Sequence, residues 1–115
     1  MKLTIHRGTH EIGGSCIELA TATTRIILDV GLPLVDANRD PFDPRAALAK
    51  PVHALKVEKV IPAVKGLFDN DSTAPDGILL SHAHLDHAGL LHLSQPTVPI
   101  YATKGTSKMM LAAAV

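Results

Sequence analysis

The stretch Ser81-His82-Ala83-His84-Leu85-Asp86-His87 follows directly on the apolar run Ile78-Leu79-Leu80. It places three imidazoles and one carboxylate within six positions, between a segment that predicts a buried strand and one that predicts a short helix. Imidazole nitrogen and carboxylate oxygen are ligands that suit Zn²⁺ and related divalent ions. The stretch therefore predicts a metal site.

The spacing divides these four ligands into two pairs. Side chains two positions apart in extended backbone point to the same side, so His82 and His84 can face one ion. Asp86 and His87 come at the first turn of the helix predicted for residues 87–93, where they can face a second ion. Two ions ~3.5–4 Å apart can activate water near neutral pH and stabilise the attacking and leaving oxygens of a displacement. The pattern therefore favours hydrolytic chemistry.

Residues 78–91 resemble the His-x-His-x-Asp-His signature of the metallo-β-lactamase superfamily. Three further segments, in the same order along the chain, are similar to the opening of its RNA-processing branch: residues 8–18, 26–31 and 98–103. That branch holds ribonuclease J and the cleavage and polyadenylation nucleases, the β-CASP proteins. The resemblance covers the whole chain but only the opening portion of such a protein.

The resemblance implies an α/β (α+β-like) fold, the N-terminal half of a four-layer αββα sandwich. Residues 1–115 would form a partial metallo-β-lactamase domain, without the second half or the inserted β-CASP domain. Residues 93–115 contain no His, Asp, Glu or Cys, so the later ligands of the family cannot come from there. We expect the isolated chain to bind zinc weakly, at one incomplete site, with little or no hydrolytic activity.

The resemblance also implies roles for individual residues. The parent protein would be a phosphodiesterase or ribonuclease that acts on RNA through water activated by two zinc ions, with His82, His84, Asp86 and His87 as metal ligands. Asp86 would also orient the nucleophile. Asp29 would brace the metal-binding turn; the alternative is an ordinary Asp at a strand end that accepts N–H groups of a turn.

The glycine-bearing segment 8–14 carries two further candidate site residues, His10 and Glu11. The simpler interpretation is that this segment only connects two strands. In the resembled family it lies at the rim of the active site, where His10 or Glu11 would contact substrate or metal.

The composition predicts a modest core of aliphatic side chains, because 46% of the 115 residues are hydrophobic and only 3% are aromatic. The formal net charge of zero predicts no general attraction to nucleic acid or to a membrane. We expect a cytoplasmic chain without a membrane partner, because no signal peptide or membrane span is recognisable. The single cysteine, Cys16, excludes an intramolecular disulfide, and we expect it to be buried.

Strands are predicted over residues 3–6, 16–20, 25–30, 78–80 and 98–101, and helices over residues 44–49, 87–93 and 104–115. Ile17 and Leu19 are expected on the buried face of a hairpin. Residues 55–61 could form helix or strand. The irregular connection 32–75 holds six of the eight prolines, and it is either a functional segment beside the active site or a surface excursion.

Three functions remain open. The first is an RNA-directed metallohydrolase. The second is a superfamily hydrolase of another ester, thioester or lactam. The third is a non-catalytic metal-binding or assembly module, because half a sandwich would expose an apolar face and a sheet edge through which homo-oligomers can form.

Overall fold

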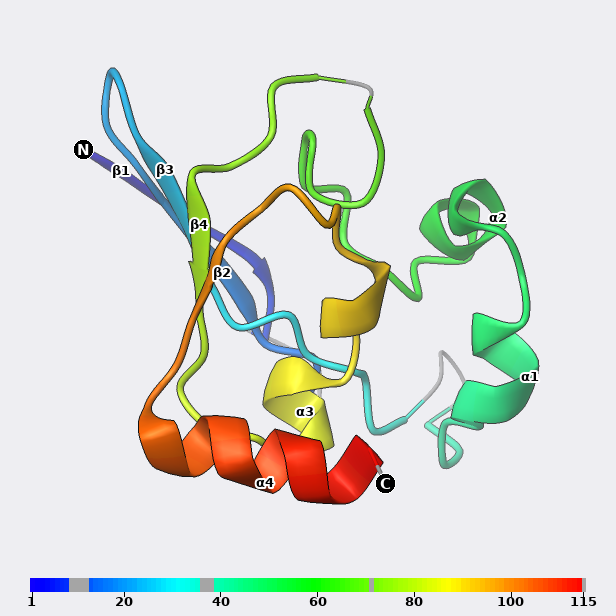
Figure 1. Ribbon diagram of the computed structural model, residues 1–115. Helices are drawn as coiled ribbons and strands as arrows, with labels where there is room; N and C mark the ends of the chain where they lie inside the picture. Colours follow the sequence, from blue (N-terminus) through cyan, green and yellow to red (C-terminus); the bar gives the residue numbers. More distant parts are fainter. Residues whose placement is uncertain (9–12, 36–38, 71, 115) are drawn as a thin grey trace.

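The computed structural model describes residues 1–8, 13–35, 39–70 and 72–114. The strands are β1 (Lys2–Arg7), β2 (Cys16–Ala20), β3 (Arg25–Leu28), β4 (Gly77–Leu79) and β5 (Ile100–Tyr101). The helices are α1 (Pro44–Leu48), α2 (Val52–Val57), α3 (Leu85–Ala88) and α4 (Lys104–Ala114), with a 3₁₀ turn, η1 (Leu91–Leu93). They lie on one side of a single sheet (Figure 1). The predicted α/β fold is confirmed, and none of the described helices has the length and apolar composition of a membrane span.

The sheet follows the order of the chain, from β1 through β5. β1, β2 and β3 pair antiparallel, whereas β3, β4 and β5 pair parallel. The parallel half requires crossovers, which are the long connection between β3 and β4 and the α3–η1 segment between β4 and β5. The carboxyl ends of β3 and β4 therefore meet at the same edge of the sheet.

The core lies on the face of the sheet that carries Cys16, Ile27 and Ile78, which are fully buried. The connection between β3 and β4 covers much of this face with apolar side chains. These are Leu32, Leu55, Val60, Ile61, Val64, Leu67 and Phe68. The alternative that residues 32–75 form a surface excursion is therefore wrong. The prolines break the connection into short pieces, but its apolar residues still provide much of the cover over the sheet.

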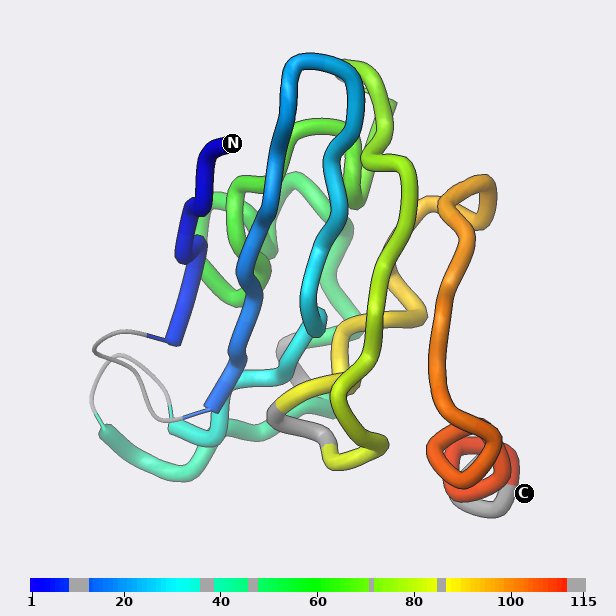
Figure 2. The backbone as a smooth tube through the Cα atoms, turned by 90° about the vertical axis from the view of Figure 1, so that its left-hand side faces the viewer, coloured from blue at the N-terminus to red at the C-terminus, as the bar shows by residue number. Residues whose placement is uncertain are grey.

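The opposite face of the sheet is apolar and open. Register pairs Leu3 with Leu19 and Ile5 with Ile17, and all four point away from the core, as do Ile26, Leu28, Leu79 and Tyr101. Leu3 is 59% exposed and Tyr101 56%. Viewed from this side, no described helix crosses in front of the strands (Figure 2). The expectation that Ile17 and Leu19 face the core is wrong, because in β2 it is Cys16 and Glu18 that lie on the core side.

Several predicted elements have other ends in the structure. β3 stops at Leu28 because Asp29 adopts a left-handed conformation, with φ of 64°. The helix predicted for residues 87–93 divides into α3 and η1, since the N–H of Leu90 donates to the carbonyl oxygen of Val30, at 3.0 Å, instead of continuing the helix. The ambiguous segment 55–61 is helical only as far as Val57, where α2 ends.

Candidate active site

The candidate site lies where β3 and β4 end. Asp29 directly follows β3, and Ser81 comes two residues after β4. The N–H of Asp29 donates to the carbonyl oxygen of Leu79 at 2.9 Å, which continues the parallel ladder by one bond beyond β3. Two segments that are 52 positions apart in the sequence are thereby placed in contact.

Asp29 binds the loop after β4 through both carboxylate oxygens. Oδ1 accepts a hydrogen bond from the N–H of Ser81 at 2.7 Å. Oδ2 lies 2.7 Å from Ser81 Oγ and 2.9 Å from His87 Nδ1. The residue is only 7% exposed, and Asp is one of the few side chains that tolerate a left-handed backbone. Asp29 therefore joins the turn after β3 to the loop that carries the imidazoles.

Three of the predicted ligands lie against one another. The ring centroids of His82 and His87 are 3.9 Å apart, and those of His82 and His84 are 4.8 Å apart with the rings nearly perpendicular. Nδ1 of His82 lies 3.0 Å from Ser81 Oγ. His82 and His87 are half-buried and His84 is exposed, so the cluster is accessible from solvent.

Backbone hydrogen bonds hold residues 81–87, here called the imidazole loop although its last residues begin α3, against the turn after β3. The carbonyl oxygen of His84 accepts from the N–H groups of His87 and Ala88, both at 2.9 Å, and so begins α3. The carbonyl oxygen of His87 accepts in turn from the N–H of Val30 at 2.9 Å. The position of His87 is therefore fixed by its backbone as well as by Asp29.

The chemistry of this donor set fits a divalent ion, because three imidazoles lie on one accessible loop and a carboxylate holds the Nδ1 side of His87. Among the described side chains, no group of three His, Cys, Asp or Glu is arranged so that it could hold a metal ion. The division of the four predicted ligands into two pairs, one for each ion, stays a prediction. The side chain of Asp86, and residues 9–12 with His10 and Glu11, lie outside the described part of the chain.

Two residues that the sequence did not single out belong to this neighbourhood. Ser81 contacts Asp29 and His82. The sequence feature that could have indicated Ser81 is a hydroxyl residue directly before the first histidine. Arg7 is 7% exposed and donates to the carbonyl oxygens of Gly14 at 2.9 Å, Gly31 at 3.0 Å and Val60 at 2.6 Å. No signal marked Arg7, because a charged residue at a strand end is usually exposed.

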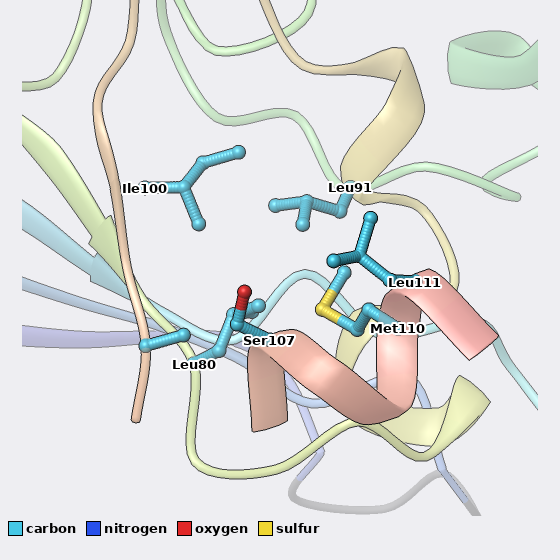
Figure 3. Close-up of a pocket in the computed structure, with 7 residues that line it drawn as sticks. Leu80, Leu91, Ile100, Ser107, Met110 and Leu111 are labelled. Atoms are coloured by element: carbon cyan, nitrogen blue, oxygen red, sulfur yellow. The ribbon is translucent and has the colours of Figure 1, made fainter. Parts of the chain in front are cut away.

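An apolar cavity of about 400 Å³ lies beside this site, between β5, η1 and α4 (Figure 3). Its lining includes Leu80, Leu91, Ile100 and Met110, and among the described lining residues Ser107 alone carries a hydroxyl. None of the described lining residues has a side chain that titrates. The titratable side chains described in this region are therefore those of the imidazole loop and of Asp29.

Comparison with known proteins identifies the family. Residues 24–113 match the model of the β-lactamase superfamily domain. The chain is 30% identical over 115 residues to the transcription termination factor FttA of Methanosarcina mazei, and 31% identical over 108 residues to an RNase J-like protein of Methanocaldococcus jannaschii. These alignments cover 96% and 94% of this chain, but only 15% and 19% of the relatives.

A solved structure agrees with these relatives. A protein of unknown function from Enterococcus faecalis V583 superposes with a TM-score of 0.71 and 27% identity, over 96% of this chain and 27% of that one. The predicted superfamily and branch are both confirmed. The chain belongs to the metallo-β-lactamase superfamily, in the branch that contains the RNase J-like proteins.

Proposed function

We propose that this chain carries the metal-binding loop of a metal-dependent hydrolase that acts on RNA, with His82, His84, Asp86 and His87 as ligands. The observation that carries the proposal is the contact among three imidazole rings, at 3.9 and 4.8 Å, on one accessible loop at the carboxyl end of β4. Such a cluster is not needed to fill a core, because His84 is exposed and the core is aliphatic. It does supply neutral nitrogen donors.

Each residue has a distinct part in this proposal. A divalent ion held by the loop would supply Lewis-acid activation of water and of a phosphoryl oxygen. Asp86 would accept a hydrogen bond from the attacking water and so orient it. Asp29 Oδ2 lies 2.9 Å from His87 Nδ1, and this contact would leave the other ring nitrogen of His87 for ligation. His10 and Glu11 are proposed to contact the substrate.

RNA is the proposed substrate because of the relatives, not because of the charge of this chain. One relative is named an RNase J-like protein, and another is named a probable RNase. The formal net charge of zero provides no general attraction to a polyanion. We therefore propose that residues 1–115 form part of a larger superfamily domain, and that they contribute the first metal ligands and little of the nucleic-acid contact.

Zinc titration of the purified chain tests the ligand assignment. The comparison is between wild type, His84→Ala and His92→Ala, because His92 is an exposed histidine on η1, away from the cluster. We expect weak binding of zinc by wild type and by His92→Ala, and at least about tenfold weaker binding by His84→Ala. Equal affinity in the two variants would contradict the assignment.

The incomplete site is tested by stoichiometry and by turnover. We expect little or no cleavage of a generic phosphodiester by the isolated chain. Tight binding of two zinc ions per chain, or turnover that His84→Ala abolishes, would show that the site is complete in these residues.

A second candidate function is a non-catalytic assembly module, and the open apolar face of the sheet favours it. Exposed apolar surfaces of this kind mark interaction sites or aggregation-prone surfaces. The two candidates differ in what they require, since assembly through this face does not depend on the imidazoles.

A further inference from the structure

Ser81 Oγ lies between the carboxylate of Asp29 and the ring of His82. It is 2.7 Å from Asp29 Oδ2 and 3.0 Å from His82 Nδ1. The same carboxylate oxygen is 2.9 Å from His87 Nδ1. One carboxylate oxygen is thus joined directly to one imidazole and, through a hydroxyl, to a second.

The chemistry of these groups determines where the protons lie. An ionised carboxylate only accepts, so the single proton of the Ser81 hydroxyl is donated to Asp29. The hydroxyl then has only lone pairs to offer His82, and therefore Nδ1 of His82 has to be the donor. Nδ1 of His87 also donates, because its partner is the carboxylate. In the neutral form of both rings, the unprotonated nitrogen is therefore Nε2.

We propose that Ser81 is a positioning residue, which extends the acceptor of Asp29 to His82 so that one aspartate sets the Nδ1–H tautomer of two imidazoles. The inference rests on the proposed function only in the purpose of the fixed tautomer, which is to present Nε2 of both rings to a metal ion. The hydrogen-bond arrangement itself is a property of the metal-free chain.

A fixed tautomer matters because a neutral imidazole can ligate only through its unprotonated nitrogen. A ring with no partner at Nδ1 exchanges between two tautomers and rotates, so only part of its population presents Nε2 in the required direction. Groups that orient ligands in this way typically contribute 10- to 100-fold in metal affinity. We expect the loss of the Ser81 hydroxyl to act within this range.

A purely structural role for Ser81 makes a different prediction. In that case the hydroxyl and the N–H of Ser81 serve only to satisfy the carboxylate of Asp29. Removal of the hydroxyl would then lower stability without changing the tautomer of either histidine. The tautomer is therefore the measurement that separates the two roles.

The experiment is two-bond ¹H–¹⁵N correlation NMR of the metal-free chain at about pH 8, above the ordinary imidazole pKa of ~6.5. In wild type we expect His82 and His87 as Nδ1–H tautomers. In Ser81→Ala, His82 should relax toward the tautomer ratio of the exposed His92, while His87 keeps Nδ1–H through Asp29. Ser81→Thr retains the hydroxyl and should restore the wild-type spectrum of His82.

Asp29→Asn provides the complementary variant, because Asn also tolerates the left-handed backbone of this position. It replaces one carboxylate oxygen by an N–H donor and should shift both histidines away from the wild-type tautomers. A His82 that remains Nδ1–H in Ser81→Ala, with the chain folded, would overturn the proposal. So would a His87 that changes in Ser81→Ala as strongly as His82.

Zinc affinity supplies the second readout, by competition with a chromophoric chelator. We expect Ser81→Ala to bind zinc about 10- to 100-fold more weakly than wild type and Ser81→Thr to bind as wild type does. A wild type that binds no zinc would contradict the proposed function, but the NMR outcome would still decide the role of Ser81. If Ser81→Ala changes the tautomer of His82 but leaves the zinc affinity unchanged, the tautomer does not serve metal binding. That outcome would overturn the purpose that we assign to Ser81.

Discussion

Arg7 Nη2 donates a hydrogen bond to the carbonyl oxygen of Gly31 at 3.0 Å, which ties the end of β1 to the turn that follows Asp29. The same guanidinium reaches the carbonyl oxygens of Gly14 and Val60. One buried side chain thus connects the glycine-bearing loop, the turn after β3 and the segment after α2. Of these three segments, the turn after β3 directly follows Asp29 of the candidate site.

Arg7→Lys should destabilise the chain by at least about 2 kcal/mol, because an ammonium cannot reach all of these carbonyl oxygens and leaves some of them buried without a donor. The free energy of unfolding in urea measures the effect. Arg45→Lys, at an exposed position on α1, is the matched control and should change it by less than about 0.5 kcal/mol. Equal small effects would show that Arg7 is replaceable.

Glu18 should make stability depend on pH in the acid range. Hydrogen bonds from Arg25 and from His6 lower the pKa of this carboxyl below its ordinary value of 4.5, against the opposing effect of burial. A lowered native pKa means that the carboxylate stabilises the fold above pH 4.5, and that this contribution is lost as the pH falls through the native pKa. The sign is therefore a loss of stability on acidification.

Urea unfolding between about pH 6 and pH 3 tests this expectation. Glu18→Gln should be less stable than wild type at pH 6, and the difference should shrink as the pH falls. Glu58→Gln, in an exposed ion pair with Lys50, controls for the removal of one negative charge. A difference between wild type and Glu18→Gln that stays constant over this range would disagree with the lowered pKa.

Cys16 should be unreactive in the folded chain. Burial raises the pKa of its thiol to about 12, and the thiolate is the reactive form. Alkylation by iodoacetamide at about pH 8 should be on the order of 10³-fold slower than in the urea-unfolded chain. Mass spectrometry over time gives both rates, and native alkylation at the unfolded rate would contradict the burial.

Gly66→Ala should destabilise the connection between β3 and β4. Gly66 has a φ of +72°, and a Cβ at this position would overlap the carbonyl group of Thr73. We expect a loss of at least about 2 kcal/mol, because the backbone of one of these two segments has to move. Gly105→Ala is the control, since a Cβ there meets nothing within 4 Å inside α4. It should instead stabilise the chain by up to about 1 kcal/mol, and thermal unfolding separates the two signs.

The open sheet face should make the purified chain self-associate. Leu3→Lys and Ile5→Lys place charges on this face and should lower the apparent mass in sedimentation velocity. Val57→Lys removes an apolar side chain on α2, away from the sheet, that is even more exposed, and should leave the mass unchanged. A wild type that sediments as a monomer of native-like stability would count against the assembly function.

The elements of the sheet were largely predictable, because short apolar runs bounded by glycine, proline or threonine mark strands well. The sequence did not show which face of the sheet becomes the core. β2 carries apolar residues on both faces, with Cys16 on one and Ile17 and Leu19 on the other, so alternation alone could not choose. The connection between β3 and β4 determines which face is buried, because its own apolar side chains cover the face that carries Cys16.

The candidate site was predictable to the extent that its residues are local in the sequence. The spacing of His82, His84 and His87 places them on one loop, and the structure brings their rings into contact. The position of Ser81, whose hydroxyl lies between Asp29 and His82, was not predictable, because serine is common at loop starts and has no periodicity. The division of the helix after His87 was equally hidden, as it depends on the distant carbonyl oxygen of Val30.

The 52 positions between Asp29 and Ser81 link the assembly of the site to the folding of the whole chain. A contact over so long a separation closes a large loop and therefore costs chain entropy. This cost is offset only when the intervening segment packs on the sheet. We therefore expect the site and the core to form in one cooperative event. Native-state hydrogen exchange should protect the amides of Val30, Ser81 and Leu90 with the same free energy as the centre of β3.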